Sequence, residues 1–240
     1  MMRGNQQPQQ LPLGVSVRDH ADFSNFFLGQ SGANRQLLQQ LQAFVTSAQE
    51  QFLFIWGEPG SGVSHLLQAA CNAAEEADQS SLYLPLSELV GADPQELLDG
   101  LERMEILCID DLQLLEHRPD WQEAVFHLYN RIRDAGGRLL IGAHNSPRGL
   151  AIELADLRSR LQWGVTYQVE SLSDDDKVAA LCERARKRGF NLPEDVARYI
   201  LYRSPRNTAV LFACLEQLDK ASLMEKRRLT LPFVKQVLGI

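Results

Sequence analysis

The sequence predicts an α/β protein in which a parallel sheet with helices on both faces is followed by a small helical domain. Three observations lead to this prediction. Up to Glu170, short apolar runs alternate with helical patterns, as in sheets whose strands are buried on both faces. A glycine-rich loop over residues 57–62 separates an apolar run from a helical pattern. After Glu170 only helical patterns follow.

Each element of the sheet region has its own signal. Strands are expected where apolar residues run together without alternation, because both faces of such a strand are covered. Helices are expected where apolar residues recur three and four positions apart. On these grounds we expect helices over residues 34–48, 63–77, 94–103 and 121–135, and strands over residues 52–56, 81–85, 105–109, 138–143 and 165–169.

The residues after Glu170 are expected to form a small helical bundle. Ser173 is a favoured N-cap residue, and the acids that follow it suit the positive end of a helix dipole. This helix should end near Gly189, with further helices over 194–202, 209–223 and 232–238. The first residues are rich in Gln, Pro and Gly, which predicts a flexible arm. The expected parts are therefore an arm over 1–21, a nucleotide-binding core over 22–170 and a helical domain over 171–240.

Composition and charge exclude several classes of protein. The formal net charge is −7, whereas a strong DNA-binding protein needs a basic face. The basic runs 184–188 and 226–228 lie near expected helix ends, where the dipole favours cations. No apolar run could cross a membrane or form a signal peptide. Four cysteines without CxxC spacing are expected to be buried thiols, which predicts a cytoplasmic protein: Cys71, Cys108, Cys182 and Cys214.

The loop after the first expected strand matches the phosphate-binding pattern G-x-x-x-x-G-K-[ST] at every position but one. Val63 stands where the pattern has lysine. Glycines in such a loop let backbone N–H groups converge on phosphate oxygens, and a hydroxyl after them can hold Mg²⁺. The alternative is a tight glycine-rich turn. The residues of this segment are Gly57, Glu58, Pro59, Gly60, Ser61, Gly62, Val63 and Ser64.

A second motif argues against that alternative. An apolar strand ends in Asp110 and Asp111, as expected of a Walker B strand, with Asp110 placed for the magnesium. The missing lysine would weaken triphosphate binding, since a charge-assisted hydrogen bond contributes roughly 1.5–3 kcal/mol. We therefore expect this site to bind a nucleotide, ADP or ATP with Mg²⁺, and to hydrolyse it poorly.

The flanking residues resemble the DnaA branch of the AAA+ family. The segment from Phe23 to Phe26, with Gly29 and Asn34 after it, is similar to the segment that clasps adenine there, and His65 continues the family's G-K-T-H-L. Residues 159–164, S-R-L-Q-W-G, resemble the box whose arginine enters a neighbouring subunit's site, which implies a catalytic role in trans for Arg160. The likeness implies an AAA+ core and a lid.

Within that branch the chain resembles the DnaA-homologous regulator (Hda) family, because the sequence ends after the lid without a helix-turn-helix domain. That resemblance implies stimulation of ATP hydrolysis on DnaA and binding to the DNA-loaded polymerase III sliding clamp. Gln10, Leu11 and Leu13 fall in Q-L-P-L-G-V, which is similar to the family's clamp-binding peptide. The alternative is a tail that packs on its own domain. A homodimer is left open.

Several assignments keep alternatives. Ala209 falls where the family has its sensor-2 arginine, and Arg206, one turn earlier, either replaces it or caps a helix. The sensor-1 position falls near His144 or Asn145. Arg160 could instead pair with an acid on its own surface, such as Glu153 or Asp156.

Two other functions compete with the regulator. One is a self-sufficient ATPase of the helicase-loader or clamp-loader type, against which Val63 and Ala209 both count. The other is a DNA-binding initiator fragment, against which the acidic charge counts.

Overall fold

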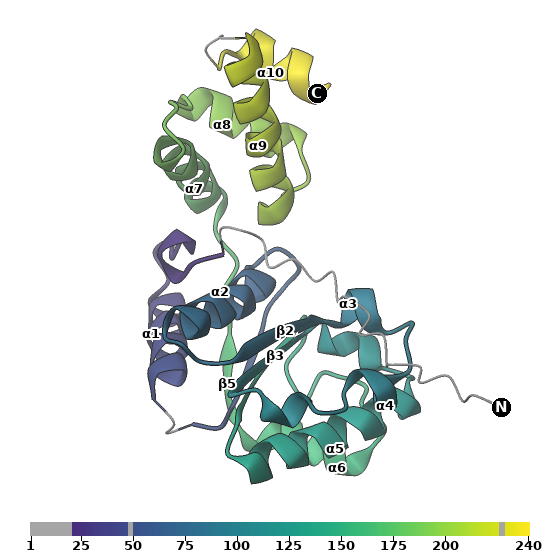
Figure 1. Ribbon diagram of the computed structural model, residues 1–240. Coiled ribbons are helices and arrows are strands. Elements are labelled where there is room, and N and C mark those ends of the chain that lie inside the picture. The colour runs from purple at the N-terminus through teal and green to yellow at the C-terminus, as the bar shows by residue number, and fades with distance from the viewer. Residues whose placement is uncertain (1–20, 48–49, 226–228) are drawn as a thin grey trace, which may run out of the picture.

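A computed structural model describes residues 21–47, 50–225 and 229–240 of the chain (Figure 1). Its core is a parallel sheet in the order β2-β3-β4-β1-β5. Strands β3 and β4 are buried along their whole length, whereas the edge strand β5 is mostly exposed. The strands are β1 (Phe52–Trp56), β2 (Ser81–Pro85), β3 (Ile106–Asp110), β4 (Arg138–Ala143) and β5 (Val165–Gln168).

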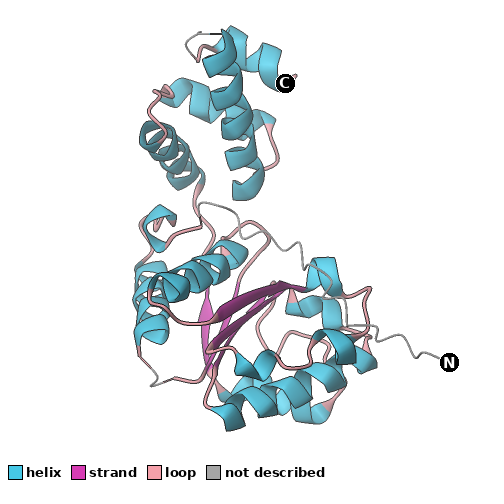
Figure 2. Ribbon diagram, viewed as in Figure 1, coloured by secondary structure: helices cyan, strands magenta, loops and turns pink. Residues whose placement is uncertain are grey.

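Helices cover both faces of this sheet (Figure 2). On one face, α1 (Gly32–Thr46) and α2 (Val63–Glu76) bury an apolar cluster against the strands. On the other face, α3 (Leu86–Leu89), α5 (Pro119–Ala135) and α6 (Ala155–Trp163) bury a second cluster, in which Trp121 is fully enclosed. The predicted fold class, a parallel sheet covered on both faces and followed by helices, is therefore confirmed.

The helices after the sheet form a separate bundle at one end of the molecule (Figure 1). They are α7 (Asp174–Lys187), α8 (Glu194–Arg203), α9 (Thr208–Glu225) and α10 (Leu231–Leu238), and they share an apolar core of their own. The Ser173 hydroxyl accepts a hydrogen bond from the Asp176 N–H, so the predicted N-cap is confirmed. Below, this bundle is called the lid.

Some sequence predictions need correction. The helix expected over residues 94–103 is broken into α4 (Pro94–Leu97) and the 3-10 turn η2 (Leu101–Arg103), because Gly100 takes a left-handed conformation with φ of 77°. Pattern analysis also missed α3, α6 and the 3-10 turns η1 (Phe23–Asn25) and η3 (Leu112–Leu115). Short turns of this kind show no helical periodicity.

Other boundaries move by one or two residues. Helix α1 starts at Gly32 because Ser31 caps it. Of the cysteines, Cys71 and Cys108 are buried as expected, but Cys182 and Cys214 are only half-buried. None of the described helices is long and apolar enough to span a bilayer. The basic run 226–228 and nearly all of the predicted arm lie outside the described residues; of the arm, only Ala21 is described, and it is buried.

Candidate functional site

The loop between β1 and α2 can be built only with glycine at key positions. A Cβ on Gly60, which has φ of 87°, would lie 2.7 Å from the side chain of Asn207. Gly62 has φ of 108°, and a Cβ there would lie 2.7 Å from the ring of Phe26. Both conformations are left-handed, which other residues rarely adopt. A loop of this kind at the start of a helix suits the binding of an anion.

A buried hydroxyl inside the loop supports this interpretation. Ser61 is 8% exposed, and its Oγ has no hydrogen-bond partner among the described residues. It packs directly against Gly57, where an added Cβ would lie 2.5 Å from that Oγ. Since buried polar groups are nearly always paired, an orphaned hydroxyl here fits a ligand that offers acceptor oxygens, such as a phosphate.

The tip of the loop has a different role. Glu58 and Pro59 are exposed, and the Ser171 hydroxyl donates to the Glu58 carboxylate at 3.4 Å. Glu58 therefore contacts the segment that connects the core to the lid. Within the described part of the chain, no contact orients the side chains of Glu58 and Pro59 toward the position that a phosphate would occupy.

Val63 points into the core rather than along the loop. It is 7% exposed and packs with Leu67 over Gly142, whose missing Cβ would lie 2.8 Å from Val63 Cγ1. Asp110 Oδ1 lies 2.9 Å from the same point. The valine thus stands beside the Walker B carboxylate, and no cation is available at this position to neutralise that carboxylate.

Hydroxyl and amide groups satisfy Asp110 in place of a cation. Tyr83 donates its hydroxyl to Asp110 Oδ2 at 2.7 Å, and the Asp111 N–H donates to Oδ1 at 2.9 Å. Burial raises the pKa of the Asp110 carboxyl, while hydrogen bonds from Ser64 and Tyr83 oppose that rise. Ser64 and Asp110 are therefore adjacent, as a shared magnesium ion would require.

The second Walker B acid contacts both η3 and the residue after β4. Asp111 lies in a left-handed conformation with φ of 61°. Its Oδ1 accepts a hydrogen bond from Gln113 at 2.9 Å and lies 3.7 Å from His144 Nε2. Of the two residues expected near the sensor-1 position, the structure thus brings His144 to this acid.

The lid reaches the phosphate loop through residues just before α9. Asn207 contacts Gly60 and caps α9, accepting the Ala209 N–H at 2.8 Å. Arg206, proposed as a substitute for the sensor-2 arginine, instead pairs with Asp174 at 3.1 Å and is 63% exposed. The residue that touches the loop is therefore Asn207, which sequence analysis did not select.

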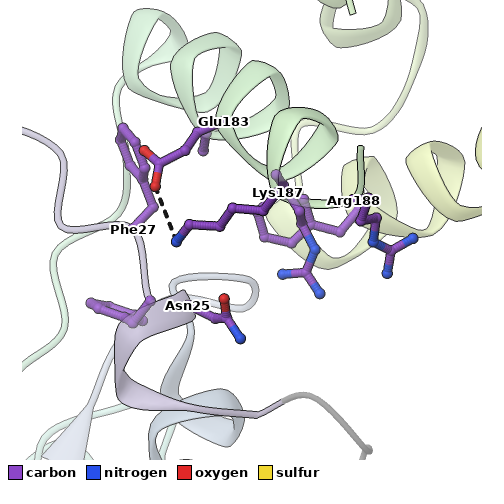
Figure 3. A pocket seen from close by; sticks show the side chains of 9 residues that line it. Asn25, Phe27, Glu183, Lys187 and Arg188 are labelled. Carbon is purple, nitrogen blue, oxygen red and sulfur yellow. Dashed lines mark ion pairs between the residues drawn. The ribbon is translucent and has the colours of Figure 1, made fainter. Parts of the chain in front are cut away.

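A cavity of 270 Å³ separates the lid from the η1 segment (Figure 3). Arg184 lies over the Phe212 ring at 4.4 Å, and Lys187 pairs with Glu183 at 3.1 Å while it donates to the Ser24 carbonyl at 3.0 Å. Aromatic walls with cations beside them suit an aromatic base that carries anionic groups. The lining residues are Asn25, Phe26, Phe27, Ala180, Glu183, Arg184, Lys187, Arg188 and Phe212.

The predicted adenine clasp lies between this cavity and the phosphate loop. Phe26 lines the cavity, and its ring stacks on His65 with centroids 6.1 Å apart. His65 Nε2 in turn lies 3.1 Å from the Asp22 carbonyl oxygen. The structure therefore brings Phe26 and His65 together next to Gly62, although they are 39 positions apart in the sequence.

Arg160 lies at the opposite end of the strands from this site. It is in the last turn of α6, just before β5 begins beside Leu53 at the start of β1, whereas the phosphate loop follows the other end of β1. The length of β1 alone separates the two by roughly 13 Å. No ion pair involves Arg160 within the described part of the chain, and Glu153 pairs instead with His117.

A phosphate loop, a Walker B strand and a lid that contacts the loop define an AAA+ nucleotide-binding module. The family model for the bacterial DnaA ATPase domain matches residues 17–168. This chain therefore belongs to the bacterial DnaA ATPase domain family. Residues 174–238 match a second family model, described as the lid domain of Hda.

Solved structures show the same fold. Domain III of DnaA from Thermotoga maritima is 23% identical, with a TM-score of 0.78 over 94% of this chain and 98% of that one. AMPPCP-bound DnaA from Aquifex aeolicus is 22% identical, with a TM-score of 0.72 over 87% and 68%. The Holliday junction branch migration motor RuvB of Thermotoga maritima is 17% identical, with a TM-score of 0.65 over 89% and 70%.

Proposed function

We propose that this protein is a cytoplasmic negative regulator of replication initiation, which stimulates hydrolysis of ATP bound to DnaA. The observation that carries the proposal is the position of Arg160. Arg160 lies at the other end of β1 from the chain's own phosphate loop, so it is placed to serve another module's nucleotide. An always-charged planar donor suits the negative charge that develops on a transferring phosphoryl group.

The chain's own site would then bind a nucleotide without rapid turnover. The loop over Gly60–Gly62 and the orphaned Ser61 hydroxyl support phosphate binding, and the adjacent Ser64 and Asp110 would hold Mg²⁺. Val63 leaves the transferring phosphoryl group without its usual cation. We therefore favour ADP as the resident nucleotide, with its base toward the cavity beside Phe26.

The clamp contact is assigned to the N-terminal arm. Gln10, Leu11 and Leu13 lie outside the described residues, so their assignment depends on the resemblance of Q-L-P-L-G-V to a clamp-binding peptide. An extended segment with alternate apolar side chains is a common form of peptide recognition. Binding the clamp on DNA would bring Arg160 to DnaA without requiring a basic face on this chain.

Replacing Arg160 by alanine tests the proposal. The rate to be measured is hydrolysis of ATP preloaded on DnaA, in the presence of this protein and the DNA-loaded clamp. Arginines that act in trans accelerate such reactions roughly 10³- to 10⁵-fold. Arg160→Ala should therefore lose nearly all of the stimulation, and Arg160→Lys should restore little, because an ammonium lacks the forked geometry.

Arg158 supplies the matched control. It lies on the same helix, and its guanidinium donates to the chain's own Ile152 carbonyl at 3.1 Å. Arg158→Ala should stimulate almost as well as the wild type. Stimulation by Arg160→Ala within a few-fold of wild type would overturn the proposal. Rapid ATP hydrolysis by the protein alone, abolished by Asp110→Ala, would instead favour a self-sufficient ATPase.

A further inference from the structure

The guanidinium of Arg160 lies against two aromatic rings. Its central carbon is 5.2 Å from the centroid of the Trp163 ring and 6.0 Å from that of the Tyr129 ring. Trp163 is 74% exposed, which is unusual for so large an apolar side chain. Tyr129 is buried and packs edge-on against Phe52, with centroids 5.3 Å apart. The arginine therefore lies close to both a buried ring and an exposed ring.

The geometry of the α6–β5 connection leaves the Trp163 side chain exposed to solvent. A Cβ on Gly164 would overlap the Phe52 ring, so the chain passes close to β1 at this point and only glycine fits. The preceding residue, Trp163, projects into solvent instead. It is three positions after Arg160 on the same helix, which puts the two side chains on one face.

Aromatic partners differ from an acidic partner because they leave the charge of the arginine intact. The negative face of a ring attracts a guanidinium without neutralising its charge, and it leaves the N–H donors unused. A carboxylate would have to release the arginine before that arginine could meet a phosphoryl group. No carboxylate of the described residues forms an ion pair with Arg160, so charge and donors are both available.

We propose that Trp163 and Tyr129 are positioning residues, which hold Arg160 extended and unpaired for entry into a partner module's nucleotide site. This inference rests on the proposed function, since it assigns a purpose to the rings only if Arg160 acts in trans. Trp163 is the better residue to test, because it is exposed and its replacement leaves the buried core intact.

The kinetic test separates positioning from docking. Stimulation of DnaA-bound ATP hydrolysis is measured against the concentration of this protein, giving a maximal rate and a half-saturating concentration. Trp163→Ala should lower the maximal rate about two- to five-fold, as expected for an exposed cation–π contact, and leave the half-saturating concentration unchanged. Trp163→Phe should restore most of the rate. Tyr202→Ala, which removes an exposed aromatic residue of the lid, is the control and should change neither value.

An NMR measurement on the protein alone tests the geometry without DnaA. The Arg160 side-chain protons should be shifted upfield in the wild type and in Trp163→Phe, and the shift should be smaller in Trp163→Ala, where only the Tyr129 ring remains. Absence of that shift in the wild type would overturn the inference, as would an unchanged maximal rate or a higher half-saturating concentration in Trp163→Ala. If the wild type itself fails to stimulate DnaA while the shift is present, the proposed function fails and the aromatic arrangement stands.

Discussion

At the scale of single residues, Val63 and Asp110 determine the charge of the proposed phosphate site. Both side chains face the same point above Gly142 in the middle of the sheet. The P-loop pattern has lysine at residue 63, where an ammonium would neutralise the acid and contact phosphate. Here Tyr83 and Ser64 donate hydrogen bonds to the carboxylate instead. The loop keeps its conformation, but it lacks the lysine ammonium group that would contact a phosphate.

Restoring the lysine should therefore strengthen nucleotide binding. Val63→Lys adds a charge-assisted hydrogen bond, worth roughly 1.5–3 kcal/mol, so the dissociation constant for ADP should fall about ten-fold or more. Isothermal titration calorimetry measures this constant directly. Val63→Met is the control, since it has a similar length without the charge. Equal affinities of the lysine and methionine variants would contradict the phosphate assignment of the loop.

Among the secondary-structure elements, the start of α7 connects the core to the lid. Ser173 caps the helix, and the acids of its first turn lie at the positive end of the helix dipole. Two of them also pair with other lid residues, Asp174 with Arg206 and Asp175 with Arg198. The same helix carries Glu183 and Lys187 into the cavity. The stability of this one helix end thus supports a wall of the proposed nucleotide cleft.

Removing the cap should destabilise the lid selectively. Ser173→Ala leaves the Asp176 N–H without its acceptor, which costs about 1 kcal/mol in helix stability. The three tryptophans, Trp56, Trp121 and Trp163, all lie in the core, so tryptophan fluorescence does not report on the lid. Hydrogen exchange of the α7 amides is therefore the suitable measurement. Exchange there should be faster in Ser173→Ala and close to wild type in Ser173→Asn, whose amide oxygen can also cap. Unchanged α7 exchange in the alanine variant would contradict the role of the cap.

At the scale of the whole molecule, the two proposed sites lie on separate surfaces. The proposed nucleotide cleft lies between the core and the lid, and α6, which carries Arg160, lies near the opposite end of the core (Figure 1). The strands of the sheet separate the two. On the proposed function, nucleotide binding at the cleft and catalysis in trans can therefore change independently, and the arm adds a third contact outside the described fold.

That independence predicts the behaviour of an arm variant. Replacing Leu11 and Leu13 together by alanine should abolish binding to the sliding clamp, because the apolar side chains that would fill its pockets are gone. The melting temperature and the ADP affinity should stay at wild-type values. Surface plasmon resonance on immobilised clamp measures clamp binding, and differential scanning calorimetry measures the melting temperature. Native clamp affinity in the double variant would show that the peptide was assigned wrongly.

Local patterns in the sequence were sufficient for the elements that form the sheet. β1, β2 and β4 lie where their apolar runs predicted them, since a strand covered on both faces needs a continuous apolar run. The glycine-rich loop between β1 and α2 and the acid at the end of β3 were also predictable, because glycine spacing and an acid at the end of a buried strand are local signals. The break at Gly100 and the helix α6 were not, since short or polar helices owe their stability to packing.

The amino-acid sequence by itself determined the fold class, the order of the motifs and the loss of the lysine at residue 63. Only the tertiary structure decided which distant residues complete the sites: Tyr83 at Asp110, Asn207 at Gly60, and the rings of Tyr129 and Trp163 at Arg160. The physical reason is that a motif specifies one backbone segment, whereas the partners of its side chains come from segments that packing brings together. Those partners leave no regular spacing in the sequence.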